Sequence, residues 1–198
     1  MTDEINRHDL AERVKLIEDM LAEGRRTTSR WGWTFVLWGI AYYIAIFWSN
    51  VASPSVAWPV CMIVTSIITA FGGRFMNRGT PRNAKSSALM SIWTAVGIAL
   101  FLFAFGASMS PHRSEAIILG GVEILLGTAN IASGLTLRWK TQLTAGLLWM
   151  AAGTSSFFVG EKVMGILFLV AIFLCQIVFG VYLMLHESIE RKREVAHA

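Results

Sequence analysis

One acidic residue in the middle of an apolar stretch is the group in this sequence best placed to do chemistry. Glu123 lies within GGVEILLGTANIASG, residues 120–134, which is otherwise typical of a membrane-spanning helix. An ionised acid near the centre of such a helix costs about 2.5 to 3.5 kcal/mol, so it needs a partner, water or a bound proton. Because no Lys or Arg falls in the apolar stretches, we expect Glu123 to be protonated or linked to water rather than ion-paired.

The spacing of small and polar residues around this acid predicts which way its helix faces. Separations of three, four, three and four residues place them on one stripe, which comprises Gly120, Glu123, Gly127, Asn130 and Gly134. Glycines let a neighbouring helix approach closely, and Glu and Asn then form hydrogen bonds between helices that contribute about 0.6 to 2 kcal/mol each. We therefore expect the stripe to face the interior of a helix bundle.

Depth within the membrane suggests which residues accompany Glu123. Tyr42, Tyr43 and Thr65 lie at comparable distances from the outer face, whereas Gln176 is closer to the depth of Asn130. In one interpretation, Glu123 binds a proton or cation in a small polar cavity that a tyrosine or the threonine completes. In the other, a neutral Glu is a hydrogen-bonding staple between helices. The sequence leaves both open.

Composition and hydropathy predict the elements that hold these residues. Of the 198 residues, 55% are hydrophobic and only 15% are charged, and the mean hydropathy is +0.55; a soluble domain carries about a quarter charged residues. We expect an all-α polytopic integral membrane protein with six transmembrane helices. The spans are predicted near residues 32–49, 56–72, 87–107, 116–136, 142–159 and 163–185.

The distribution of basic residues predicts the orientation. All of the 17 Lys and Arg residues except Arg113 and Lys162 fall on one side of the predicted spans, and such residues are retained in the cytoplasm. We expect a multi-pass protein of the plasma membrane, the bacterial inner membrane, with both termini cytoplasmic. The net charge of +4 is then an orientation signal that also suits contact with membrane lipids, and nucleic-acid binding is not needed to explain it.

The chain before the first span predicts a separate helix. Asp3 and Glu4 suit the first turn of a helix over residues 2–23, and Gly24 is placed to end it. An apolar seam like that of a short coiled coil follows from spacings of four, three and four, at Leu10, Val14, Ile17 and Leu21. We expect this helix to bind a second copy of the chain or another protein; the alternative is a solvated connector. The predicted organisation is a cytoplasmic amphipathic helix and basic anchor over 1–30, a transmembrane domain over 31–186 and a basic cytoplasmic tail over 187–198.

A faint repeat suggests that the six spans form three hairpins. Gly39, Gly97 and Gly153 occupy similar places in the first helix of each hairpin. Paired spans with Trp and Gly in the first helix, a short outer turn and a basic segment after the second resemble the HdeD-type bacterial inner-membrane proteins, most clearly over residues 120–153, GGVEILLGTANIASGLTLRWKTQLTAGLLWMAAG. The resemblance implies a six-helix fold and a role in acid-stress resistance without a defined reaction.

Motifs that would indicate catalysis are missing from the sequence. There is no HExxH zinc motif, GxSxG elbow or phosphate-binding GxxxxGK[ST] loop, and the four histidines lie outside or at the edges of the predicted spans. We therefore expect no enzyme, no cofactor, no catalytic residue and no metal site. The leading function is a non-catalytic role in membrane or envelope homeostasis or stress response through protein or lipid contacts. The alternatives are a transporter or channel for a small solute or proton centred on Glu123, and a sensor that signals through the N-terminal helix.

Overall fold

Helices make up nearly all of the chain that the structure describes. The computed structural model describes residues 2–51, 53–76, 84–111 and 114–197, and no strand occurs within them. The helices are α1 (Thr2–Arg30), α2 (Gly32–Val51), α3 (Pro54–Met76), α4 (Ala84–Met109), α5 (Glu115–Thr136), α6 (Lys140–Ser155), α7 (Glu161–Ile172), the π-helical turn η1 (Phe173–Val178) and α8 (Phe179–His197). The predicted all-α fold class is confirmed.

Several of these helices are long and apolar enough to cross a membrane. Among the described residues, five stretches meet both conditions: Glu12–Val51, Pro54–Phe75, Ser87–Met109, Glu115–Thr136 and Glu161–Ile189. Helix α6, which overlaps the predicted fifth span, has 16 residues and a length of about 24 Å, against a hydrocarbon core of about 30 Å. The length and composition of these helices indicate a membrane protein.

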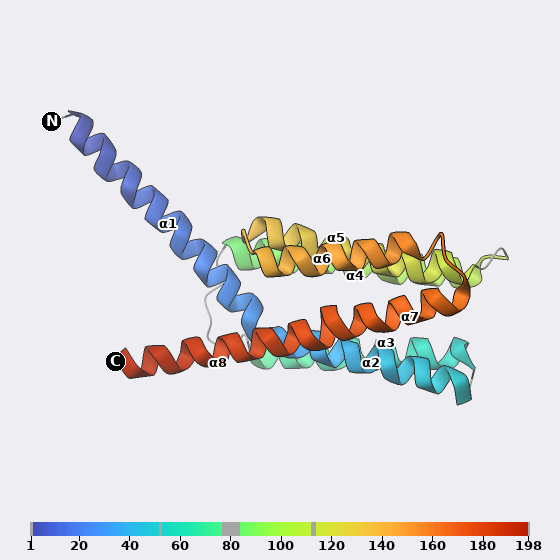
Figure 1. The fold of residues 1–198 in the computed structure, drawn as a ribbon. Helices are drawn as coiled ribbons and strands as arrows, with labels where there is room; N and C mark the ends of the chain where they lie inside the picture. The colour runs from blue at the N-terminus through green and yellow to red at the C-terminus, as the bar shows by residue number, and fades with distance from the viewer. Residues whose placement is uncertain (1, 52, 77–83, 112–113, 198) are drawn as a thin grey trace.

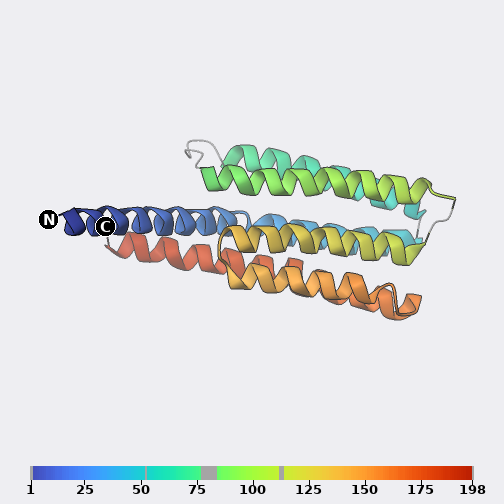
Figure 2. The same ribbon diagram turned by 90° about the horizontal axis from the view of Figure 1, so that it is seen from above.

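The helices form two layers with a third element between them. Helices α4, α5 and α6 lie in one layer and α2 and α3 in the other, while the continuous helix α7–η1–α8 contacts both α2 and α6 (Figures 1 and 2). Both chain termini lie at one end of the bundle, which we call the terminal end. The N-terminal ends of α5 and α7 lie at the opposite end, which we call the far end (Figure 1).

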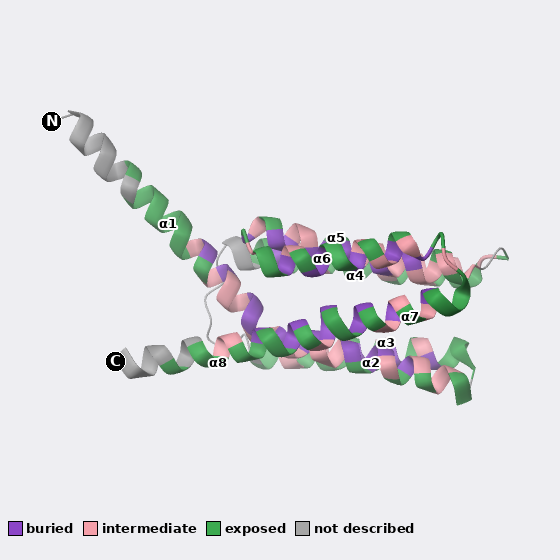
Figure 3. Ribbon diagram, viewed as in Figure 1, coloured by how far each residue is buried: buried purple, intermediate pink, exposed green. Residues whose placement is uncertain are grey.

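Burial is concentrated where the two layers meet α7–η1–α8. Figure 3 shows buried positions along α2, α5, α6 and α7, whereas α3 and α4 are mostly exposed. An aromatic cluster fills the centre: Phe168 lies with its ring centroid 6.0 Å from that of Tyr42 and 6.5 Å from those of Trp58 and Trp149. In a membrane protein the exposed apolar side chains of α3 and α4 suit contact with lipid. Polar side chains in the buried interior need hydrogen-bond partners there, because lipid provides none.

Glycines bring helices from opposite ends of the chain together. A methyl carbon built on Gly32 of α2 would lie 2.9 Å from the carbonyl oxygen of Gly180 on α8, and one built on Gly180 would lie 2.9 Å from the carbonyl oxygen of Gly32. Contacts this short leave no room for any other residue at either position. The first helix of the bundle is thus fastened to the last one by their backbones.

Helix α1 is longer than the sequence predicts and is fixed to the bundle at its end. It continues through Gly24 to Arg30, and the Thr28 hydroxyl donates to the Gly24 carbonyl oxygen at 3.1 Å. The Arg25 guanidinium donates from Nε to the Leu137 carbonyl oxygen at 3.0 Å and from Nη2 to that of Arg138 at 3.2 Å. Arg25 thereby joins α1 to the turn between α5 and α6.

That turn is closed by a residue in the left-handed conformation. Arg138 has a φ of 49°, and the Trp139 amide donates to the Gly134 carbonyl oxygen at 2.8 Å while the Arg138 amide donates to Leu135 at 3.2 Å. This is the Schellman pattern of helix termination, in which glycine is usual at the left-handed position. A side chain there costs about 1 to 2 kcal/mol in backbone strain.

We therefore expect Arg138→Gly to stabilise the protein by about 1 kcal/mol, because glycine relieves the strain while the Arg25 contacts, which use backbone oxygens, remain. Thermal unfolding in detergent, followed by circular dichroism, measures the change. Arg138→Ala is the control, since it removes the same charge but keeps the strain. Equal midpoints for the two variants would show that the charge, and not φ, sets the stability of this turn.

Candidate functional site

The predicted intramembrane acid is fully buried, and among the described residues one side chain bonds to it. Glu123 on α5 has an exposed fraction of 0%, and the Ser156 hydroxyl, at the C-terminal cap of α6, donates to its Oε2 at 3.0 Å. Ser156 Oγ also lies 3.1 Å from the Ala152 carbonyl oxygen. The other carboxyl oxygen of Glu123, Oε1, has no hydrogen-bond partner among the described residues.

This arrangement suits both protonation states of the acid. A hydroxyl has one hydrogen to donate and two lone pairs to accept. When Glu123 is ionised, Ser156 donates to it. When Glu123 is protonated, it donates to Ser156, and Ser156 turns its hydrogen to the Ala152 carbonyl oxygen. The pair can therefore exchange a proton without losing its hydrogen bond.

Glycines on the predicted stripe position the acid by bringing α5 and α6 into backbone contact. A methyl carbon on Gly120 would lie 2.9 Å from the Gly153 carbonyl oxygen, and one on Gly127 would lie 3.0 Å from that of Gly146. One on Gly134 would lie 2.7 Å from the Leu143 amide nitrogen. The structure thus places all three predicted packing glycines against α6, where their lack of side chains allows the close approach.

Buried polar side chains of α5 and α6 lie on one side of these two packed helices. Ser133 and Gln142 immediately precede the contact residues Gly134 and Leu143, and because α5 and α6 run in opposite directions, the same one-residue step turns both toward the same side. The same reasoning from the Gly127–Gly146 contact places the other buried polar groups there. We call this set the polar seam; it comprises Glu123, Asn130 and Ser133 of α5 and Gln142, Trp149 and Ser156 of α6.

The polar seam contains several polar atoms that no described residue satisfies. All six side chains have an exposed fraction of 0%. Asn130 Nδ2 donates to the Leu126 carbonyl oxygen at 2.9 Å, but its Oδ1 is without a partner in the described part of the chain. The same holds, within those residues, for Glu123 Oε1, Ser133 Oγ, Trp149 Nε1 and both polar atoms of Gln142. From Glu123 to Ser133 the seam extends about 15 Å along the helix, half the thickness of a hydrocarbon core.

The π-helical turn faces the middle of the seam. The Cys175 thiol contacts the Ala145 carbonyl oxygen of α6 at 3.5 Å. Gln176, which was predicted near the depth of Asn130, is buried next to it, and its Cβ would lie 3.0 Å from a methyl carbon on Gly39 of α2. Its Oε1 has no partner among the described residues. A π turn widens the helix locally and is frequent at functional sites.

The tyrosines and the threonine predicted beside Glu123 make other contacts. Tyr42 is buried among aromatic rings, with its own ring centroid 6.0 Å from that of Trp58. The Tyr43 hydroxyl donates to the Leu169 carbonyl oxygen at 2.9 Å. The Thr65 hydroxyl donates to the Cys61 carbonyl oxygen of its own helix at 2.7 Å. Ser156, which was not predicted from the sequence, lies beside the acid instead.

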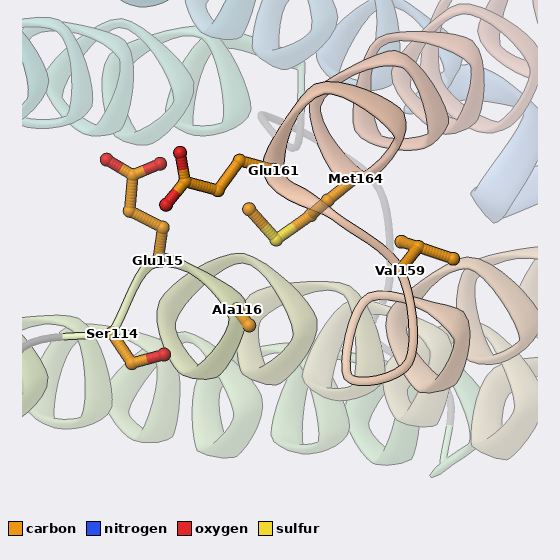
Figure 4. Close-up of a pocket in the computed structure, with 6 residues that line it drawn as sticks. All are labelled: Ser114, Glu115, Ala116, Val159, Glu161 and Met164. Atoms are coloured by element: carbon orange, nitrogen blue, oxygen red, sulfur yellow. The ribbon is translucent and has the colours of Figure 1, made fainter.

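A pocket opens at the far end of the bundle, beyond Glu123 and Ser156. Glu115 and Glu161, the first residues of α5 and α7, line it from two sides, and Figure 4 shows their carboxylates turned toward each other. Ser114, Ala116, Val159 and Met164 complete the lining. Glu115 precedes Glu123 by eight residues, about 12 Å along α5, so the pocket lies on the side from which the seam would be reached.

A signal for the residues that were missed is present in the sequence. Gln142, Trp149 and Ser156 are separated by seven residues each, which places them on one face of α6.

The chain was compared with models of protein families, with curated proteins and with solved structures, and no match was found in any of the three comparisons.

Proposed function

We propose that this chain is a non-catalytic membrane protein that binds and passes a proton or a small polar solute along the polar seam, with Glu123 as the central group. The proposal includes six crossings arranged as three hairpins, with both termini on the cytoplasmic side of the bacterial inner membrane. The positive charges around the terminal end support this orientation. The role we propose in the cell is membrane or envelope homeostasis or stress response, in line with the resemblance to HdeD-type proteins.

The observation that carries the proposal is the row of buried polar atoms that have no hydrogen-bond partner in the part of the chain that the structure describes. A buried donor or acceptor that lacks a hydrogen bond costs about 1 to 3 kcal/mol, and native proteins contain few of them. In the polar seam they follow one another along the facing sides of α5 and α6. A purely structural staple between α5 and α6 requires Glu123 and Ser156 alone, so the remaining polar groups support a path for a bound species.

Proton uptake by the full chain in proteoliposomes tests this function. With an imposed pH gradient and an entrapped dye, we expect uptake above that of empty liposomes, and we expect Glu123→Gln to lower the rate at least about tenfold, because the amide cannot release a proton. Asp19→Asn, which neutralises an exposed acid of α1, is the control and should leave the rate unchanged. Equal rates for wild type and Glu123→Gln, at equal amounts of inserted protein, would contradict the proposal.

Infrared spectroscopy separates proton binding from proton passage. In purified protein, a carboxyl band that changes with pH and is absent from Glu123→Gln would identify an exchangeable proton at this site. A carboxyl band that stays unchanged across the pH range would identify Glu123 as a neutral staple, and the function would have to be sought elsewhere in the molecule.

A second candidate function is a sensor that signals through α1, and the contact of Arg25 favours it. Because Arg25 binds backbone oxygens at the end of α5, a change in the position of α5 would be transmitted to α1. Loss of that link in Arg25→Ala should uncouple α1 from the bundle, which spin labels on the two parts would report as a broader distance distribution. An unchanged distribution would argue against this coupling.

A further inference from the structure

Helix α1 carries an exposed apolar stripe beyond its contact with the bundle. Leu10, Val14 and Ile17 are 64%, 49% and 50% exposed, whereas Leu21, the next residue on the same face, is only 8% exposed. Spacings of four and three residues place the three exposed side chains in one line. Figures 1 and 3 show α1 leaving the bundle at the terminal end with this part uncovered.

The bundle fixes the direction in which α1 leaves it. Leu21 is buried and Arg25 binds the turn after α5, so the helix is held at its C-terminal half. Two copies inserted in one membrane with the same orientation therefore present α1 in the same direction. If these helices pair, the pair is parallel.

Charges beside the stripe fit a parallel pair of identical helices. With Val14 at position a of a heptad and Ile17 at position d, Arg13 falls at g and Glu18 at the following e. In a parallel pair, g of one helix lies beside the next e of the other, so Arg13 meets the partner's Glu18 twice across the two-fold axis. An antiparallel pair would bring g to g and e to e, where the charges are alike.

We infer that α1 forms a short parallel coiled coil with α1 of a second copy of this chain, with layers at Leu10, Val14 and Ile17. Val14 at position a with Leu10 at the preceding d is the combination that favours two strands, whereas Ile17 at d taken alone favours three or four. Three layers are few for a free coiled coil, but insertion in a common membrane raises the effective concentration of one helix for the other. An anionic lipid surface is a poorer partner for the stripe. Between residues 10 and 23 the acids Glu12, Glu18, Asp19 and Glu23 outnumber the bases Arg13 and Lys15.

Cysteine crosslinking in native membranes tests the pairing with the full chain. Val14→Cys should form disulfide-linked dimers, because position a faces its counterpart in a parallel pair in register. Leu16→Cys is the matched control: Leu16 is apolar and 61% exposed, but it lies off the stripe. The native Cys61 and Cys175 are buried, so the unmodified chain provides the background. We expect at least about fivefold more dimer from Val14→Cys than from Leu16→Cys. Equal yields would indicate random collisions and overturn the inference.

A charge exchange tests the register and does not depend on the seam. In the Val14→Cys background, Arg13→Glu and Glu18→Arg should each lower the dimer yield about fivefold, since each places like charges across the pair. The two changes combined in one chain should restore the yield. Failure of the combined variant to recover would overturn the proposed register, whereas flux through Glu123 would be unaffected in either case.

Discussion

Replacement of Gly153 by leucine is expected to force α5 and α6 apart and to destabilise the bundle by about 3 kcal/mol. A methyl carbon at this position would lie 2.8 Å from the Gly120 carbonyl oxygen, 2.9 Å from Glu123 Cβ and 2.9 Å from Ile124 Cγ1. A backbone oxygen cannot move aside as the end of a flexible side chain can. Overpacking of this kind costs about 1 to 3 kcal/mol and occasionally more, and leucine adds three further carbons.

The sequence offers a matched control for that experiment on another helix of the bundle. Gly97 of α4 has nothing within 4 Å of a methyl carbon built on it, so Gly97→Leu should change stability by no more than about 0.5 kcal/mol. Unfolding in detergent, followed by circular dichroism, gives both values. Similar losses for the two variants would mean that the cost comes from leucine in a membrane helix generally, and that the backbone contact between α5 and α6 is not the cause.

Replacement of Gln142 by methionine is expected to raise stability while it lowers flux. Both polar atoms of Gln142 are buried and have no partner within the described residues. An apolar side chain of similar shape removes the cost of burying them, which we expect to stabilise the protein by about 1 kcal/mol. If the polar seam carries a proton or solute, the same change interrupts the seam near the N-terminus of α6 and lowers uptake at least about tenfold.

Measuring both quantities on the same variant distinguishes two roles for this residue. Thr144→Val is the control, because Thr144 is exposed on the same helix and its hydroxyl donates to the Lys140 carbonyl oxygen at 3.0 Å. It should leave flux unchanged and stability within about 0.5 kcal/mol. A loss of stability in Gln142→Met would show that its amide is satisfied in the membrane and supports the fold, contrary to this prediction.

The interior face of α5 could be predicted from the sequence, but the side chains of other helices that lie next to Glu123 could not. Spacing alone placed Glu123, Asn130 and the three glycines on one stripe, because the period of the helix fixes which residues share a face. Tyr43 and Thr65 were chosen by depth, and depth does not determine where around its helix a side chain points. The Tyr43 hydroxyl donates instead to the Leu169 carbonyl oxygen. This contact depends on how α2 packs against α7, which the sequence does not reveal.

The fold departs from prediction where packing overrides local signals. Glycine is frequent at helix ends, yet α1 continues through Gly24 to Arg30. The contacts of Leu21 and Arg25 with the bundle hold the turn that follows Gly24. The π turn at Phe173–Val178 has no composition that marks it, since its residues also suit an ordinary membrane helix. Its wider turn depends on what α2 and α6 present to Cys175 and Gln176.

The close approach of Gly32 to Gly180 sets a limit on when this protein can finish folding. Among the helices of the bundle, α2, which carries Gly32, is synthesised first, and α8, which carries Gly180, is synthesised last. Until then the first helix has no complement for its Gly32 face, and the nascent chain must hold that face in lipid or against a temporary neighbour. Assembly is therefore governed by a contact of very high sequence separation, so slow synthesis or early release should expose α2 to quality control in the membrane.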